Sequence, residues 1–148
     1  MYCLLFAPNS TANYSIIVIP KYEEEKRVII MTKFPTISAP TFVRDPENAS
    51  DYDAKHAPYI EIDVIDDIAT ITVTAGYYVA HPNDPDHFFE WFVLQAKDQP
   101  IAHFVGMPEV VNPIMTVEVN LPPGAVIEAL AHCNLHGTFK AEAVIPEA

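Results

Sequence analysis

Short runs in which apolar and polar side chains alternate dominate the second half of the chain. The first run, Tyr59–Ile65, sets three β-branched residues against Glu61 and Asp63, a two-residue period typical of a half-buried strand. A second run, Ile68–Thr74, is rich in β-branched residues and follows directly after two aspartates. Together the two runs predict a pair of strands joined by a tight turn.

Five more runs of this kind follow, most of them separated by glycine or proline. They are Phe88–Ala96, Ile101–Val105, Ile114–Val119, Val126–His132 and Thr138–Ile145. About seven strands with turns every roughly 8–12 residues are the pattern of an antiparallel sandwich or barrel. The 14 prolines also argue against a helical bundle, because a proline inside a helix costs about 3 kcal/mol. The predicted fold class is therefore all-β.

The beginning of the chain gives a weaker pattern. Tyr14–Ile19 and Arg27–Thr32 could form a hairpin around the segment Lys21–Glu25. Residues 35–53 hold three prolines, and we expect a long surface loop there. Because Met31 lies inside the second run, a translation start at that residue is a hypothesis, which would leave 148 − 30 = 118 residues. An intact-mass measurement on the native protein tests it.

Composition and charge exclude several classes of function. The 148 residues suit one domain with a buried core, since half of them are apolar. The 20 acidic and 8 basic residues give a formal net charge of −12, which argues against binding to nucleic acids or anionic membranes. No segment approaches the ~20 apolar residues of a membrane span. The short apolar start lacks the basic region of a signal peptide, so we expect a cytoplasmic, reducing location.

Three short segments carry residue types that bind transition metals. The first holds Cys133 and His136, the second His81 and His87, and the third His56. A soft thiolate joined to several imidazoles suits a transition metal, not magnesium or calcium. With only two cysteines the chain is not a disulfide scaffold. We expect ordinary structural or surface roles for the remaining residues of these types, which are Cys3, His103 and His132.

The local sequence also predicts how these segments are shaped. Gly137 permits a tight turn on which the thiolate and the neighbouring imidazole reach one ion. We expect the backbone N–H groups of Asn134 and Leu135 to point toward the sulfur and tune its electron donation. Two prolines exclude a regular helix from the segment of the paired imidazoles. His56 stands two residues before Pro58, on what we expect to be a non-helical stretch.

In their order along the chain, these segments resemble the motifs of a known family. They read Lys55-His56-Ala57-Pro58, then His81-Pro82-Asn83-Asp84-Pro85-Asp86-His87 followed by Glu90-Trp91, and then Cys133-Asn134-Leu135-His136-Gly137. This set resembles superoxide reductases of the neelaredoxin and desulfoferrodoxin type. The resemblance covers about residues 54–145. We therefore expect residues 1–53 to be an N-terminal extension and residues 54–148 to be the iron-binding domain.

The resemblance implies an immunoglobulin-like antiparallel β-sandwich that holds one mononuclear iron. By matching motifs, the axial ligand would be the thiolate of Cys133, and the four equatorial imidazoles would be those of His56, His81, His87 and His136. The position opposite the sulfur would be open in the ferrous state. A second, rubredoxin-like iron site needs four further cysteines, so the resemblance is to the one-iron form.

The resemblance also implies an activity. Family members reduce superoxide by one electron, release it with two protons as hydrogen peroxide, and are re-reduced by rubredoxin or a similar carrier. They form dimers or tetramers, so we expect a homo-oligomer. Lys55 would be the catalytic cation, which reverses the local effect of the negative net charge and helps to deliver protons through ordered water.

Two positions depart from the family pattern. A glutamate that ligates the ferric iron usually precedes the lysine, and that position is Ala54 here. The candidates for the ferric ligand are then Asp51, Asp53, water or hydroxide. Phe139 stands where the family usually has a tryptophan after the cysteine turn, which is a mild change.

Two other interpretations of the same residues remain open. A type-1 copper electron carrier is also a β-sandwich with an upstream histidine and a Cys-x-x-His turn. Its weak axial methionine usually follows that turn, and no methionine follows Met115 here. The second alternative is a partner-binding sandwich with an incidental zinc, although structural zinc prefers four tetrahedral ligands that are often cysteines.

Overall fold

The computed structural model describes residues 14–18, 29–33 and 39–147. The chain divides into two compact units, residues 1–36 and residues 37–148. In the first unit, β1 (Tyr14–Val18) and β2 (Ile29–Lys33) pair antiparallel. β1 falls within the predicted run Tyr14–Ile19, and β2 overlaps the predicted run Arg27–Thr32 but ends one residue later. The segment Lys21–Glu25 between them lies outside the described residues.

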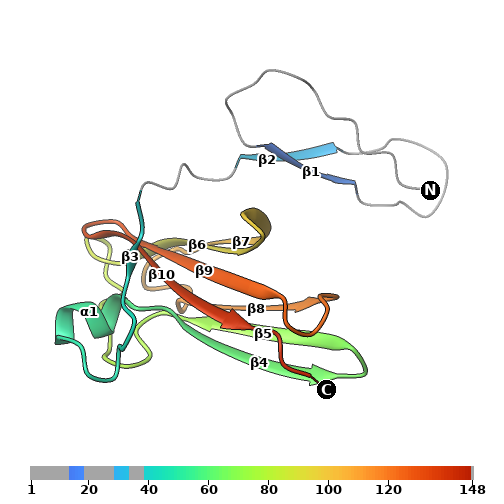
Figure 1. Ribbon diagram of the computed structural model, residues 1–148. Helices are drawn as coiled ribbons and strands as arrows, with labels where there is room; N and C mark the ends of the chain where they lie inside the picture. The colour runs from blue at the N-terminus through green and yellow to red at the C-terminus, as the bar shows by residue number, and fades with distance from the viewer. Residues whose placement is uncertain (1–13, 19–28, 34–38, 148) are drawn as a thin grey trace. The chain divides into compact units, whose positions relative to one another are not determined.

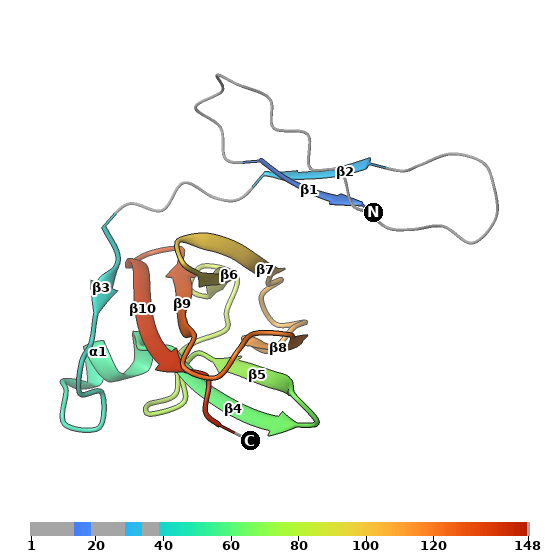
Figure 2. The same ribbon diagram turned by 45° about the vertical axis from the view of Figure 1, so that its right-hand side comes forward.

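Two sheets build the second unit (Figure 1). The five-stranded sheet has the order β3 (Thr41–Phe42), β10 (Gly137–Val144), β9 (Val126–Cys133), β6 (Phe89–Ala96) and β7 (Gln99–Val105). The three-stranded sheet has the order β4 (Tyr59–Ile65), β5 (Ile68–Thr74) and β8 (Ile114–Val119). Every pair is antiparallel except β3 with β10. The predicted all-β sandwich is confirmed, and Figure 2 shows the two layers from a second side.

The hydrophobic core lies between the two sheets. Alternate residues of β5 and β9 point into it, and side chains of both sheets belong to one buried cluster. The inward row of β9 ends at the metal-ligand candidate, because Ile127, Ala129, Ala131 and Cys133 are each fully buried. Because every second residue of β9 faces the core, the thiol of Cys133, the last residue of the strand, also points inward.

Helix α1 (Asp51–His56) is the main departure from the expected fold. The sequence predicts a surface loop over residues 35–53 and a non-helical stretch at His56. The loop ends before residue 51, where α1 begins, and the expectation for His56 is wrong. The Ser50 side chain caps the helix by accepting a hydrogen bond from the Asp53 backbone N–H at 3.2 Å. Pro58 restricts the conformation of the residue directly before it, Ala57, which is extended. His56, two residues before the proline, is still helical.

Two further expectations concern the turn at the site and the membrane. Gly137 has a φ angle of 83°, a left-handed conformation that glycine adopts without strain, so the predicted bend after His136 is confirmed. Among the described residues no helix is long and apolar enough to span a membrane.

Candidate metal centre

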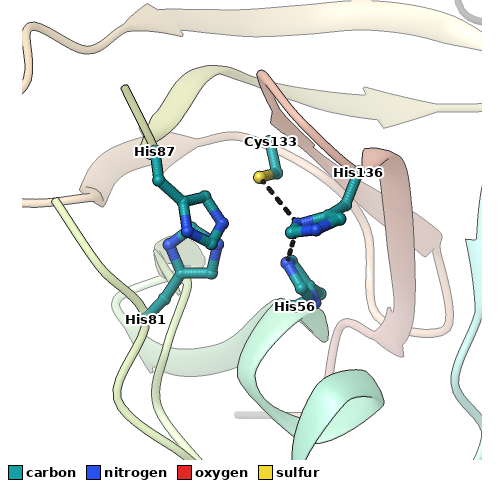
Figure 3. Close-up of side chains that lie close together, drawn as sticks. All are labelled: His56, His81, His87, Cys133 and His136. Atoms are coloured by element: carbon teal, nitrogen blue, oxygen red, sulfur yellow. Dashed lines mark hydrogen bonds between the residues drawn. The ribbon is translucent and has the colours of Figure 1, made fainter. Parts of the chain in front are cut away.

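Five side chains from three separate segments meet at one end of the sandwich. Each offers one nitrogen or sulfur atom, and these five atoms all lie within 4.8 Å of one another. The residues are His56, His81, His87, Cys133 and His136, which is the set proposed from the sequence. Figure 3 shows them pointing toward a common centre, with two imidazoles on each side and the thiol between them.

His56 is held at the end of α1 with one ring nitrogen directed at the centre. Its Nδ1 lies 2.5 Å from the backbone oxygen of Tyr52, so Nδ1–H donates to that carbonyl and fixes the tautomer. The ring is fully buried and stacks on Phe139 at 4.7 Å between centroids. Its Nε2 lies 3.0 Å from Nδ1 of His136. The smaller Phe139, in place of tryptophan, thus still gives the imidazole a flat support.

His81 and His87 enter from the loop between β5 and β6. Backbone hydrogen bonds in both directions between Asp84 and His87 close this loop at 3.1 and 3.0 Å. The Nδ1 of His81 lies 2.7 Å from the carbonyl oxygen of Pro82. This nitrogen therefore carries the ring proton and donates a hydrogen bond to that oxygen. The prolines therefore shape a loop that presents both rings inward.

The remaining ring nitrogens of this loop give a direct indication of a bound ion. The Nε2 atoms of His81 and His87 are buried and have no hydrogen-bond partner among the described residues. Buried polar atoms normally have a partner, and an orphaned one needs a specific explanation such as an ion. Both residues belong to the group of five donors, so a metal bound at the common centre through these nitrogens would satisfy them.

Cys133 and His136 come from the turn that joins β9 to β10. The cysteine is fully buried, and its Sγ lies 3.5 Å from Nδ1 of His136. Since His56 also faces this same Nδ1, His136 presents Nδ1 to the centre, whereas His56 and His81 present Nε2. The three-residue step on a tight turn brings sulfur and nitrogen to one point as expected.

Asn134 has a different role from the one predicted. Its backbone N–H donates to the carbonyl of Phe88 at 3.1 Å instead of pointing at the sulfur, so that expectation is wrong. Its Oδ1 accepts from the Phe88 N–H at 2.9 Å, and its Nδ2 donates to the carbonyl of Asp86 at 2.9 Å. Asn134 thus ties the cysteine turn to both residues that flank His87. For the N–H of Leu135, the orientation toward sulfur stays a prediction.

Burial makes the imidazoles of the centre good ligands at neutral pH. Loss of hydration lowers the pKa of His81 to about 4 and also lowers the pKa values of His56 and His87. Smaller contributions come from the neighbouring imidazoles and from the ammonium of Lys55. A metal binds the neutral imidazole, so the site is prepared to accept an ion without first losing protons from these rings.

The positions just before His56 differ in what they can offer the centre. Ala54 is 3% exposed, packed into the structure by α1. Neither Asp51 nor Asp53 belongs to the group of donors, and the carboxylate of Asp53 accepts a hydrogen bond from the Ser50 hydroxyl at 2.8 Å. In the part of the chain that the structure describes, no carboxylate therefore joins the five donors.

The two other histidines, His103 and His132, do not belong to the group of five donors found among the described residues. The ring of His132 stacks on Trp91 at 4.8 Å, its Nδ1 lies 2.9 Å from the Thr138 hydroxyl, and its Nε2 lies 3.4 Å from the Glu90 carboxylate. His103 is not part of the group of donors. Cys3 lies outside the described residues. The residue that sequence reasoning missed is Tyr52, whose spacing from His56 is informative only once a helix is known.

The donor set matches one family of proteins. The desulfoferrodoxin family model matches residues 48–142 of this chain. The chain belongs to the desulfoferrodoxin family. Its four imidazoles and one thiolate fit the mononuclear iron site of such a protein, whereas a type-1 copper site needs only two imidazoles with the thiolate.

Individual relatives align with more than half of the chain. A superoxide reductase of Thermococcus kodakarensis is 28% identical in an alignment of 100 positions that covers 62% of this chain and 87% of that protein. The desulfoferrodoxin of Desulfarculus baarsii is 33% identical over 88 residues, which are 60% of this chain and 62% of that protein. The structure of a superoxide reductase from Nanoarchaeum equitans superposes with a TM-score of 0.59 at 26% identity, and covers 72% of this chain and all of that chain.

Proposed function

We propose that this chain is a superoxide reductase of the one-iron type. The observation that carries the proposal is the group of four imidazoles and one thiolate whose donor atoms all lie within 4.8 Å. Membership of the desulfoferrodoxin family supports it, as do relatives named superoxide reductase. The reaction takes up one superoxide, one electron and two protons, and it yields one hydrogen peroxide.

The five donor residues would hold the iron, which, when bound, would supply the single electron for the reduction. Buried carbonyls set the direction of the rings: the Tyr52 carbonyl orients His56, and the Pro82 carbonyl orients His81. Hydrogen bonds of this kind raise the basicity of the ligating nitrogen and restrict the ring to one orientation. Cys133 adds a thiolate in a position that excludes water, because its side chain is fully buried.

Lys55 attracts the substrate. Superoxide is an anion and the chain carries a net charge of −12, so the long-range field is repulsive. Salt limits that field to about 8 Å at physiological ionic strength, and a cation beside the site therefore decides the local potential. The Lys55 charge contributes to the lowered pKa values of His56, His81 and His87, which indicates that it acts at the centre.

Water or hydroxide is the ferric-state ligand that best fits this chain. The usual glutamate is replaced by Ala54, and Asp53 is engaged by Ser50. The departure from the family therefore changes the resting state of the oxidised protein and leaves the group of five donors complete.

The reaction needs a reductant, and a rubredoxin-like carrier is proposed for that role. A homo-oligomer of two or four copies is proposed from the family resemblance. A cytoplasmic location is proposed because Cys133, a free thiol, must stay reduced to bind metal. Residues 54–148 are proposed as the iron-binding domain, with residues 1–53 as an extension; the family match over residues 48–142 supports this.

Pulse radiolysis of iron-loaded protein tests the function. We expect superoxide to decay in a second-order reaction with the ferrous protein, while the iron becomes ferric. Elemental analysis of the purified protein should give one iron per chain. Copper at one per chain without iron would contradict the proposal and favour the electron-carrier alternative.

A further inference from the structure

Tyr52 on α1 contacts both the metal centre and the catalytic cation. Tyr52 is followed three residues later by Lys55 and four residues later by His56, so all three lie on one face of the helix. The Tyr52 ring centroid lies 4.7 Å from that of His56 and 5.2 Å from that of His136. The Nζ atom of Lys55 lies 5.9 Å from the centroid of the same tyrosine ring, within the range of a cation–π contact.

Lys55 is not neutralised by this arrangement. The ion pairs formed by the described residues involve His132 and Lys140, and none includes Lys55. The helix has acidic residues of its own, but the carboxylate of Asp53 accepts a hydrogen bond from Ser50. Although the chain has 20 acidic and 8 basic residues, no carboxylate among the described residues forms an ion pair with this lysine.

An aromatic ring and a carboxylate can both bind an ammonium group, but they differ in their effect on its positive charge. A carboxylate at ion-pair distance would cancel the positive charge that a passing anion detects. An aromatic face attracts the ammonium through its quadrupole and carries no net charge, so the positive potential survives. Tyr52 is 46% exposed, so this residue lies at the surface, where a small anion in solution can approach it.

We propose that Tyr52 is a positioning residue whose ring holds the Lys55 ammonium beside the metal centre without neutralising it. The inference rests on the proposed function, in which Lys55 attracts superoxide. It adds a role to a side chain that donates nothing to the metal. It also explains how a strongly acidic protein keeps a cation beside the centre that forms no ion pair with the described residues.

Substitutions at Tyr52 separate the ring from the charge. Tyr52→Leu should slow the second-order reaction with superoxide by about two- to fivefold, the rate equivalent of an exposed cation–π contact. Tyr52→Phe keeps the ring face and should restore the rate to within about twofold of the original. Tyr52→Glu should slow the reaction as much as Lys55→Ala does, because the new carboxylate pairs with Lys55 at a spacing of three residues.

Tyr77 provides a matched control. It is 56% exposed and stacks on Tyr59 at 3.8 Å between centroids, so Tyr77→Leu also removes an exposed tyrosine from an aromatic pair. We expect no change in the superoxide rate for this variant. An equal loss of rate in Tyr77→Leu and Tyr52→Leu would overturn the inference, because the effect would then not depend on Lys55.

A double substitution decides whether Tyr52 acts through the lysine. In the Lys55→Ala background, Tyr52→Leu should cause no further loss of rate. A similar loss in both backgrounds would mean that Tyr52 acts only by packing against His56 and His136, and the inference would be wrong. Iron content, measured for each variant, shows whether the centre is still loaded.

Proton NMR of the full-length, zinc-loaded chain tests the contact without iron or turnover. The methylene protons of Lys55 should be shifted upfield by the ring current of Tyr52, and the shift should persist in Tyr52→Phe and disappear in Tyr52→Leu. Unshifted Lys55 resonances in a wild-type protein that reduces superoxide would overturn the inference alone. A wild-type protein that reduces no superoxide would overturn the proposed function instead.

Discussion

At the scale of single residues, the centre is built by hydrogen bonds that aim each donor atom. One carbonyl oxygen accepts a hydrogen bond from Nδ1–H of His56 and another accepts one from Nδ1–H of His81, so Nε2 faces inward in both. Local motifs could indicate which residues bind the metal, because the residue types and their spacing are in the sequence. They could not indicate which nitrogen does so, since that depends on where the fold brings a carbonyl.

Asn134 should stabilise the centre by linking two of its segments. Its side chain joins Phe88 and Asp86 through two hydrogen bonds of 2.9 Å each. Asn134→Ala should destabilise the metal-free protein by about 1–3 kcal/mol and weaken iron binding, as measured by denaturant unfolding and metal titration. Asn48→Ala is the control, because among the described residues the exposed Asn48 side chain bonds only to Asp45. Equal effects of the two variants would contradict the role of Asn134.

The stability of the metal-free protein should fall in acid because of the buried imidazoles. Burial lowers the pKa of His81 from 6.5 to about 4, so the unfolded chain binds more protons than the folded one between these values. This contribution to stability is therefore fully present above about pH 6.5 and is lost as the pH falls toward 4. Urea unfolding at several pH values checks this, and His81→Gln should flatten the dependence. An unchanged slope in that variant would contradict the assignment.

At the scale of elements, the sequence predicts most of the strands of the second unit but not the helix. The predicted bounds Tyr59–Ile65, Ile68–Thr74 and Ile114–Val119 are those of β4, β5 and β8, because alternation reflects one face turned to the core. Helix α1 has six residues, too few to give a helical period. Its existence depends on the Ser50 cap and on tertiary burial, and neither is an apolar pattern along the chain.

Ala54 should not tolerate the glutamate that the family usually has at this position. Its side chain is 3% exposed in α1, and a carboxylate there would be buried without a partner in the metal-free protein. Ala54→Glu should lower the free energy of unfolding by about 2 kcal/mol or more, measured by urea titration. At the exposed position 51 of the same helix, Asp51→Glu should change it by less than about 0.5 kcal/mol. An Ala54→Glu protein as stable as the original would show that α1 can turn this side chain outward.

At the scale of the whole molecule, the fold and the charge act in opposite directions on the substrate. The sandwich places five donors at one end of its core. The net charge of −12 repels an anion at long range. In the proposed function, Lys55 and the Tyr52 ring beside it would offset this repulsion at the centre.

The salt dependence of the superoxide reaction should reverse sign when Lys55 is removed. Raising the ionic strength from about 0.01 M to about 0.15 M shortens the screening length from ~30 to ~8 Å. The wild-type rate should fall, because salt screens the attraction by Lys55. In Lys55→Ala the rate should be about tenfold lower and should rise with salt, because only repulsion is left to screen.

Lys97→Gln is the control, because it makes an equal change of charge at an exposed turn. Its salt dependence should keep the wild-type sign. A reversal of sign in both variants would contradict a local role for Lys55.

The measurement that tests the account most directly is the yield of hydrogen peroxide from superoxide added to the ferrous, iron-loaded protein. A reductase should give one peroxide for each superoxide consumed, oxidise one iron per turnover and release no dioxygen. Cys133→Ser should give no turnover, since it removes the thiolate donor while leaving the four imidazoles in place. One peroxide for every two superoxides with release of dioxygen, or unchanged turnover in Cys133→Ser, would contradict the account.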